Sequence, residues 1–426
     1  MARICLDGFN LAIPQGSGIA SYGRNLLDTI NRTGHSAQVL YGMAENKSRR
    51  VSESRLAEGD VKPFKPRKSE RYVETLTARF GRSPYFVPTK DHVIWDERTG
   101  GKPPVSGFWF NPSLFNYAAR SFSAYGKMTP VEFKGDQKPD IMHWTCPLPL
   151  WAKNIPNIVT FHDLIPLILP HSTGDDKVRY AQLCTQVAER ADHIVAVSEK
   201  TADDVCTILG VPESKISVTY QAAYLPQAVV PSQASAMADV DGIFELNWKG
   251  YFIHYGSVEP KKNLGRIVEA YLSSKVDLPL VLVGGRAWLE KNEIGLLNQI
   301  RAHGLSSSRR IIQYDYLPRR LLASLIMGSR SVVFPSLYEG FGLPVVEAMS
   351  LNTSVITSSA GSLPEVAGDA AYICDPYDID QLATAFKDMA GDLLLAEHYA
   401  QLGLHRAKTF SQEAYDQKIS ALYARY

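Results

Sequence analysis

Positions 331–349 read Ser-Val-Val-Phe-Pro-Ser-Leu-Tyr-Glu-Gly-Phe-Gly-Leu-Pro-Val-Val-Glu-Ala-Met. The first four residues form a short, valine-rich apolar run that stops at Pro335, which is typical of a buried strand in a parallel sheet. From Leu343 the chain is apolar again, and Pro344 suits the first turn of a helix, where its missing N–H has no partner to lose. We therefore expect a strand, a tight turn and a helix in succession.

The turn between this strand and this helix carries groups suited to a polar ligand. Gly340 and Gly342 let the backbone come close to a bound molecule, and the helix start offers free N–H groups to an anion such as phosphate. Glu339 and Glu347 bracket the turn, and carboxylates accept hydrogen bonds from sugar hydroxyls. The residues thus predict a pocket for a phosphorylated sugar or a nucleotide. An ordinary strand–turn–helix joint with two surface glutamates is the other interpretation.

The same segment resembles the E-x7-E signature of retaining glycosyltransferases with the two-domain GT-B fold, in particular family 4 of the mannosyl- and rhamnosyltransferase type. Four further segments resemble other motifs of that family and follow in its order. They are the histidine motif at 160–164, the segment 197–199, the donor-phosphate segment at 255–264 and the segment 361–365. The resemblance covers most of residues 140–390 and a short N-terminal piece, and it is weak between about 44 and 135.

Short apolar strands alternate with helical segments along most of the chain, which predicts parallel sheets covered on both faces by helices. In the second half the expected strands include 331–334, 354–357, 364–366 and 371–374. The resemblance implies an α/β fold of the GT-B type, in which two Rossmann-like, doubly wound parallel-sheet domains face an interdomain cleft and the C-terminal helix crosses back to the N-domain. The expected units are an N-terminal acceptor domain at 1–225 with an insertion at 44–135, a linker at 226–246, a nucleotide-sugar donor domain at 247–405 and the returning helix at 406–426.

Composition argues against several classes of function. The 426 residues carry a formal net charge of +1, so no overall charge draws the chain toward nucleic acid. The five cysteines show no zinc-like or redox spacing, which favours a reducing cytoplasm. No apolar run reaches the roughly 18 residues needed to span a bilayer, and the N-terminus does not resemble a signal peptide. We expect a cytoplasmic protein, either free or peripheral at the inner face of the membrane.

A glycine pair near the N-terminus raises a second possibility. Gly16 and Gly18 lie between an expected strand at 2–6 and an expected helix at 19–30, as in dinucleotide-binding folds. The next glycine, Gly23, is out of register with the G-x-G-x-x-G pattern, and no acidic residue follows at the place where it would bind the ribose. The residues therefore do not favour NAD. In the family that the chain resembles, the same loop, with Gly18 here, contacts the donor diphosphate.

The resemblance assigns the site residue by residue. His162 and Glu339 are the expected catalytic residues, near the anomeric carbon and the 3-hydroxyl of the donor sugar. Lys262 would face the diphosphate, and Glu347 would accept hydrogen bonds from the ribose. The expected donor-binding set is Gly18, Gly256, Ser257, Lys262, Gly340, Phe341, Gly342, Leu343 and Glu347. A lone histidine at a strand end or a lysine at a helix start can also be merely structural, and neither a metal nor another cofactor is expected.

Two enzyme classes fit these residues. The first is a retaining, metal-independent glycosyltransferase that moves a hexose from a nucleotide-diphosphate sugar, with GDP-mannose or a related sugar favoured, to a glycan or lipid-linked saccharide in surface polysaccharide synthesis. The second is a nonhydrolysing sugar-nucleotide epimerase on the same fold, which needs no acceptor. A nonenzymatic binding module ranks behind both because the donor set is complete.

Residues 44–135 have a different composition from the rest of the chain. Basic residues are frequent between Lys47 and Arg82, and aromatic residues gather between Phe108 and Tyr125. The basic side chains could hold a lipid diphosphate or an anionic membrane surface, and the aromatic rings could stack on sugars or lie at headgroup level. The other interpretation is a solvated excursion whose aromatic residues cover the sheet of the N-domain.

Overall fold

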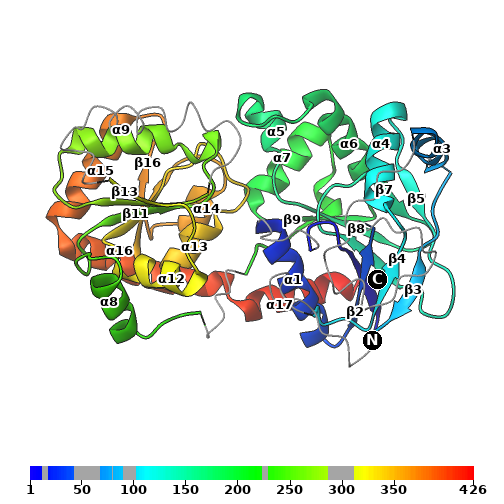
Figure 1. Cartoon of the computed structure of the whole chain (residues 1–426), viewed down its shortest axis with the longest axis horizontal. Coiled ribbons are helices and arrows are strands. Elements are labelled where there is room, and N and C mark those ends of the chain that lie inside the picture. The colour runs from blue at the N-terminus through cyan, green and yellow to red at the C-terminus, as the bar shows by residue number, and fades with distance from the viewer. Residues whose placement is uncertain (12–17, 43–67, 79, 90–101, 223–228, 286–310) are drawn as a thin grey trace.

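The computed structural model describes residues 1–11, 18–42, 68–78, 80–89, 102–222, 229–285 and 311–426. They form two α/β domains that lie side by side, each with a central sheet flanked by helices (Figure 1). This is the doubly wound, two-domain α/β arrangement that the sequence predicts.

The N-terminal domain is built on an eight-stranded sheet of order β10-β9-β8-β6-β1-β2-β4-β3, and a separate parallel pair joins β5 to β7. All neighbours in the large sheet are parallel except β3, which runs antiparallel to β4. The strands are β1 Arg3–Asp7, β2 Ser36–Tyr41, β3 Tyr85–Pro88, β4 Gly107–Phe110, β5 Thr129–Val131, β6 Ile141–Trp144, β7 Leu150–Ala152, β8 Asn157–Phe161, β9 His193–Ala196 and β10 Ile216–Val218. The helices are α1 Gly18–Arg32, α3 Lys68–Ala78, α4 Leu114–Tyr125, α5 Ile165–Ile168, α6 Lys177–Arg190 and α7 Glu199–Leu209, with 3₁₀ turns η2 Pro170–Ser172 and η3 Glu213–Lys215.

The C-terminal domain holds a six-stranded, all-parallel sheet of order β13-β12-β11-β14-β15-β16. Its strands are β11 Phe252–Tyr255, β12 Leu280–Val283, β13 Ile311–Tyr314, β14 Ser331–Phe334, β15 Ser354–Ser358 and β16 Tyr372–Cys374. The helices that follow the first domain are α8 Gln233–Gly242, α9 Leu264–Ser274, α12 Arg319–Gly328, α13 Leu343–Ser350, α14 Leu363–Ala367, α15 Ile379–Gly391, α16 Leu393–Ala407 and α17 Gln412–Tyr423, with 3₁₀ turns η4 Pro260–Lys262 and η6 Lys408–Phe410.

Three expected segments either differ from the structure or lie outside its described residues. The strand expected at 364–366 is wrong, because these residues lie in helix α14, which begins at Leu363 and carries Pro364 in its first turn. The expected linker at 226–246 contains α8, whose start is capped when Ser232 accepts a hydrogen bond from the Ser235 N–H. The helix expected at 288–303 lies outside the described residues.

Part of the expected insertion at 44–135 belongs to the N-terminal sheet. β4 pairs with β2 from Gln38 to Tyr41, and β3 adds the edge strand. The three aromatic residues of β4, Phe108 to Phe110, are fully buried. Residues 107–110 and 85–88 therefore extend the sheet, which supports the interpretation that the aromatic residues cover the N-domain core. Positions 43–67 and 90–101 lie outside the described residues.

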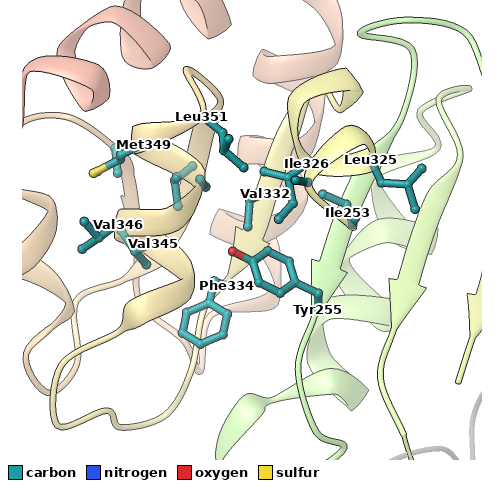
Figure 2. Packing of buried hydrophobic residues seen from close by; sticks show 14 of the residues in the cluster. Ile253, Tyr255, Leu325, Ile326, Val332, Phe334, Val345, Val346, Met349 and Leu351 are labelled. Carbon is teal, nitrogen blue, oxygen red and sulfur yellow. The ribbon is translucent and has the colours of Figure 1, made fainter. Parts of the chain in front are cut away.

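An apolar cluster between α12, α13 and the C-terminal sheet positions the turn after β14 (Figure 2). Figure 2 shows Val345 and Val346 of α13 on one side and Ile253 and Val332 of the sheet on the other. All four are at least 99% buried. Burial of each such side chain contributes about 1.5–3 kcal/mol. Strand and helix are thus held rigidly at both ends of the eight-residue turn 335–342.

The C-terminal helix returns to the first domain. α17 leaves the C-terminal domain and lies along α1 (Figure 1). Asp416 of α17 accepts hydrogen bonds from the Arg32 Nε at 2.7 Å and the Thr29 hydroxyl at 2.8 Å. Tyr415 and Ile419 are buried in the N-domain core. The expected crossing of the last helix back to the N-domain is confirmed.

Candidate functional site

The turn between β14 and α13 is fixed by hydrogen bonds to its backbone. The Ser362 hydroxyl lies 3.0 Å from the Glu339 carbonyl and 2.9 Å from the Phe341 carbonyl. Gly342 has a φ of 100°, which favours glycine, and it lies directly before the first residue of α13. The local sequence therefore presents the Glu339 side chain and the free N–H groups of α13 at the carboxyl edge of the sheet.

Glu339 forms a buried ion pair with Lys262. The Lys262 Nζ lies 2.6 Å from the Glu339 Oε1, and the Lys261 Nζ lies 3.9 Å from Oε2. Burial raises the pKa of Glu339, but the charges of Lys262 and Lys261 outweigh it, so the pKa lies below its ordinary value. The Glu339 carboxylate is therefore ionised at neutral pH, and its charge is balanced by two lysines.

Asn263 places Lys262 beside the turn. Asn263 adopts a left-handed conformation with φ of 63° between η4 and α9, which asparagine tolerates better than most residues. Its side-chain amide donates to the Pro335 carbonyl at 3.1 Å and to the Pro376 carbonyl at 2.7 Å. The segment 255–264 is thereby tied to the end of β14.

Gly256 and Ser257 follow the neighbouring strand β11. Gly256 has a φ of 135°, and its N–H donates to the Val283 carbonyl at 2.9 Å. The Ser257 hydroxyl donates to the Glu259 carboxylate at 2.5 Å. Because β11 and β14 are neighbours, these two residues share the sheet edge that carries Glu339.

Glu347 lines a cleft of about 340 Å³ between the domains. The Tyr255 hydroxyl donates to its Oε2 at 3.2 Å. Burial raises the pKa of Glu347, and the Tyr255 hydrogen bond and the Arg319 charge oppose that shift. The cleft is lined by α1, α12, α13 and the segment after β10, through residues that include Gly18, Ser21, Tyr22, Asn25, Gln221, Arg319, Leu343 and Glu347.

His162 stands at the end of β8 with both ring nitrogens in hydrogen bonds. Its Nε2 lies 2.9 Å from the Thr145 carbonyl, and its Nδ1 lies 3.0 Å from the Gln221 side-chain nitrogen. The Tyr22 ring meets the imidazole edge-on at 4.8 Å. Burial lowers the pKa of His162 to about 4, although the Thr145 hydrogen bond opposes this shift. The imidazole is therefore neutral at pH 7.

The two catalytic candidates approach each other across the domain interface. The Gly340 carbonyl accepts a hydrogen bond from the Ser198 hydroxyl at 2.6 Å and lies 3.1 Å from the Thr201 hydroxyl. A Cβ at Gly340 would lie 1.7 Å from the His162 carbonyl oxygen. Only glycine allows this approach. Backbone contact thus joins the histidine motif directly to the turn that carries Glu339.

The structure divides the predicted residues into two groups. Lys262, Glu339 and Gly340 lie together beside His162, and Gly18, Leu343 and Glu347 line the cleft. The Phe341 side chain points into the core, with its ring 5.3 Å from that of Phe410. Only its backbone remains as a candidate for sugar contact.

Two carboxylates near the site have structural roles. The Asp163 carboxylate accepts from the Ile165 N–H at 3.1 Å, so it supports the turn after β8. Glu365 accepts the N–H groups of Glu199 and Lys200 at 2.8 and 3.1 Å, so it caps α7 of the other domain.

Sequence reasoning missed Tyr22, Gln221 and Arg319 as lining residues of the cleft. Tyr22 looks like an ordinary member of the apolar face of α1. Gln221 does carry a signal, because it follows a parallel strand at the sheet edge where ligands bind in such folds. Arg319 carries a comparable signal as the first residue of helix α12, which follows β13 of the C-terminal sheet.

Within the described ranges, no group of three or more histidine, cysteine, aspartate or glutamate side chains is arranged to hold a metal ion. None of the helices described there is long and apolar enough to cross a membrane.

Two protein-family models match the sequence. One, described as glycosyl transferases group 1, matches residues 244–404, and the other, described as glycosyltransferase family 4, matches residues 16–222. The matches fall on the C-terminal and N-terminal domains respectively.

Curated relatives include O-antigen chain mannosyltransferase B of Escherichia coli, which is 32% identical over 262 residues, or 60% of this chain and 67% of that protein. The serotype-specific mannosyltransferase WbdA of Escherichia coli is 30% identical over 240 residues, or 54% of this chain and 29% of WbdA. The chain thus spans about two thirds of the first relative and less than a third of the second.

Solved structures share the whole architecture. Sucrose-phosphate synthase from Thermosynechococcus elongatus matches with a TM-score of 0.69 at 16% identity, over 100% of this chain and 99% of that one. HepE from Anabaena, in complex with UDP and glucose, matches with a TM-score of 0.68 at 15% identity over 100% of both chains. At these identities the likeness bears on the fold alone, and the fold is GT-B.

Proposed function

This chain belongs to glycosyltransferase family 4 with the GT-B fold, and from this premise we propose that it transfers a hexose from a nucleotide-diphosphate sugar to a glycan or lipid-linked saccharide. We favour mannose from GDP-mannose, because the relatives named above are mannosyltransferases and one of them acts on O-antigen chains by name. Synthesis of a surface polysaccharide is the matching process. These relatives do not favour the epimerase alternative.

The observation that carries the proposal is the buried pair of Lys262 and Glu339 beside the start of α13. When a nucleoside diphosphate leaves, negative charge grows on its phosphate, and a lysine and free helix N–H groups stabilise that charge. The ionised Glu339 can accept hydrogen bonds from sugar hydroxyls. Without a donor the two side chains neutralise each other, so we expect the donor to separate them, with the diphosphate on Lys262 and the sugar on Glu339.

The nucleoside is assigned to the cleft that Glu347 lines. Its volume of about 340 Å³ falls within the usual range for small-molecule sites of roughly 300–1,000 Å³. The Glu347 carboxylate can accept from two ribose hydroxyls, and the Tyr255 hydroxyl holds it in place. Gly18 and the start of α1 face it from the N-domain.

We further propose that transfer retains the anomeric configuration and needs no bound metal. Lys262 and the N–H groups at the start of α13 bring to the leaving diphosphate the positive charge that a divalent cation supplies in other transferases. His162, held neutral at the domain interface, contributes a polar wall near the sugar.

The acceptor is assigned to the N-domain, with a lipid diphosphate or an anionic membrane surface as the partner of its basic segment. Tyr72, Val73 and Phe80 in and just after α3 are exposed apolar groups of the kind that lie at headgroup level. The basic positions Arg49, Arg50, Lys65 and Arg67 lie outside the described residues. Replacing these four and Lys68 by Gln should abolish binding to anionic liposomes or raise the acceptor KM, with nucleotide affinity unchanged. Wild-type values for both would assign the segment to scaffolding.

Isothermal titration of the chain with GDP and with UDP, in buffer containing a chelator, tests the donor assignment. We expect heat with at least one nucleotide and tighter binding of GDP. A folded sample that gives no heat with either nucleotide would remove the basis of the proposal.

A further inference from the structure

Gln221 joins the segment after β10 to the catalytic candidate on β8. It is 92% buried, and its side-chain nitrogen lies 3.0 Å from the His162 Nδ1. The same side chain lines the cleft that Glu347 lines. Gln221 therefore stands between the imidazole and the space assigned to the donor.

The donor and acceptor capacities of the neighbours determine the tautomer of His162. A backbone carbonyl can only accept, so the nitrogen that faces the Thr145 carbonyl, Nε2, must carry a proton. In a neutral imidazole the other nitrogen, Nδ1, is then an acceptor, and it receives a hydrogen bond from the Gln221 amide NH₂. Both ring nitrogens are thus occupied by the protein itself.

The Thr145 carbonyl, which accepts the hydrogen bond from Nε2, is itself held in place. The Thr145 N–H donates to the Oδ2 of Asp7 at 2.5 Å, and Asp7 is fully buried at the end of β1. The Thr145 carbonyl therefore cannot turn away easily, and Nε2 keeps its proton. Whether the ring is neutral or cationic therefore depends on whether Nδ1, which faces Gln221, takes up a proton.

The titratable groups around the ring do not set the protonation of Nδ1, so this protonation depends on Gln221. Burial raises the pKa of Tyr22, which packs edge-on against the imidazole, so its hydroxyl stays neutral. Burial also lowers the pKa of His143 on β6 to about 3, so it adds no positive charge at neutral pH. Asp7, whose pKa burial raises to about 6, contacts the ring only through the Thr145 backbone.

We propose that Gln221 is a positioning residue that holds His162 as the neutral Nε2–H tautomer and covers the one nitrogen able to take a proton or a sugar hydroxyl. In this arrangement His162 does not act as a proton acceptor unless the amide of Gln221 moves away. A donor hydroxyl that reaches Nδ1 must displace the amide. The position of Gln221 thus controls which donors the imidazole can contact. This last consequence rests on the proposed function, whereas the tautomer does not.

The tautomer can be measured directly by ¹⁵N NMR of histidine side chains in the full chain. The His162 signals are identified by their loss in His162→Gln. At pH 7 we expect an unprotonated Nδ1 and a protonated Nε2. A protonated Nδ1 in the wild-type chain, whether in the other tautomer or in the cation, would overturn the proposal without any variant of Gln221.

Two substitutions then test the part played by Gln221. Gln221→Glu offers Nδ1 an ionised acceptor, so the ring should take up a second proton and its pKa should rise by roughly one to three pH units. Gln221→Met removes the hydrogen bond with similar volume, and the Nδ1 signal should shift while the pKa stays low. Gln401→Glu makes the same charge change at an exposed position of α16 and should leave the His162 signals unchanged.

The kinetic result separates a positioning role from a merely structural one. With Gln221→Glu, transfer should fall at acidic pH, where the ring becomes charged, and recover as pH rises through the new pKa of His162, because the neutral ring returns. An unchanged His162 pKa in Gln221→Glu would refute the proposal. If no nucleotide sugar is turned over by the wild-type chain, the proposed function fails while the NMR result still decides the tautomer.

Discussion

Glu339 lies in the turn before α13 and Glu347 lies within that helix, yet their carboxylates face different neighbours. Glu339 is balanced by Lys262 and Lys261, whereas Glu347 receives one tyrosine hydroxyl and a distant arginine charge. The pKa of Glu339 is therefore below its ordinary value, and that of Glu347 is above it. Loss of the carboxylate charge should therefore lower the stability of the fold at Glu339 and raise it at Glu347.

Thermal melts of Glu339→Gln and Glu347→Gln check this difference. At pH 7 the first change leaves Lys262 with a weaker partner and should cost about 1–3 kcal/mol. The second removes a charge that burial disfavours, so Tm should rise. A group with a lowered folded pKa stabilises above its unfolded pKa, near 4.5, and loses this effect as pH falls through the folded value. The deficit of Glu339→Gln should therefore shrink below about pH 4.5. Equal Tm shifts of the same sign would contradict the assignment.

Nucleotide affinity distinguishes the same two residues by function. Glu347→Ala should weaken GDP binding by about 1.5–3 kcal/mol, because a charged hydrogen-bond acceptor of the ribose is lost. Glu339→Ala frees Lys262 for phosphate, so GDP affinity should stay equal or improve while turnover falls. Titration calorimetry and steady-state rates measure both. Equal losses of GDP affinity in the two variants would refute the division of roles.

At the scale of the element, α7 is capped by a residue of the other domain. The Glu365 carboxylate accepts from the Glu199 and Lys200 N–H groups at the positive end of the helix dipole. Glu365→Ala should cost about 0.5–2 kcal/mol, as loss of a helix cap does. Because the cap bridges the domains, turnover should fall as well. Glu413→Ala, at an exposed position in α17, is the control. Equal melting temperatures and equal transfer rates in the two variants would show that the cap is unimportant.

The unit of β14, turn and α13 could be predicted from sequence because its cues are local. Valines, a stopping proline, paired glycines and Pro344 each restrict the backbone near themselves. The segment 364–366, Pro-Glu-Val, is shorter still, and periodicity cannot decide between strand and helix over so few residues. Strand β4 and the edge strand β3 were missed because their pairing depends on tertiary contacts.

Within the site, the family motifs pointed to residues at strand ends, and these do lie at the facing edges of the two sheets. Gln221 could not be predicted in its role, because its bond to His162 joins residues 59 apart in the chain. The interface between the His162 carbonyl and Gly340 depends equally on how the two domains meet. Local sequence carries no signal for such a contact.

At the scale of the whole molecule, the two domains meet through Gly340. A methyl group there would lie 1.7 Å from the His162 carbonyl, so Gly340→Ala must push the histidine and Glu339 apart. We expect transfer to fall roughly hundredfold, the effect of a displacement of about 1 Å in a catalytic site. Gly391→Ala is the matched control, because a Cβ there meets nothing within 4 Å. Equal rates in the two variants would show that this contact does not set the geometry of the site.

Retaining transfer of a hexose from a nucleotide sugar can be tested by ¹H NMR of the reaction with GDP-α-mannose and a mannose-containing oligosaccharide. We expect release of GDP together with a new α-mannosidic signal on the acceptor, in buffer with a chelator. A β-linked product, or a second nucleotide sugar formed by isomerisation while the acceptor stays unchanged, would contradict retaining transfer.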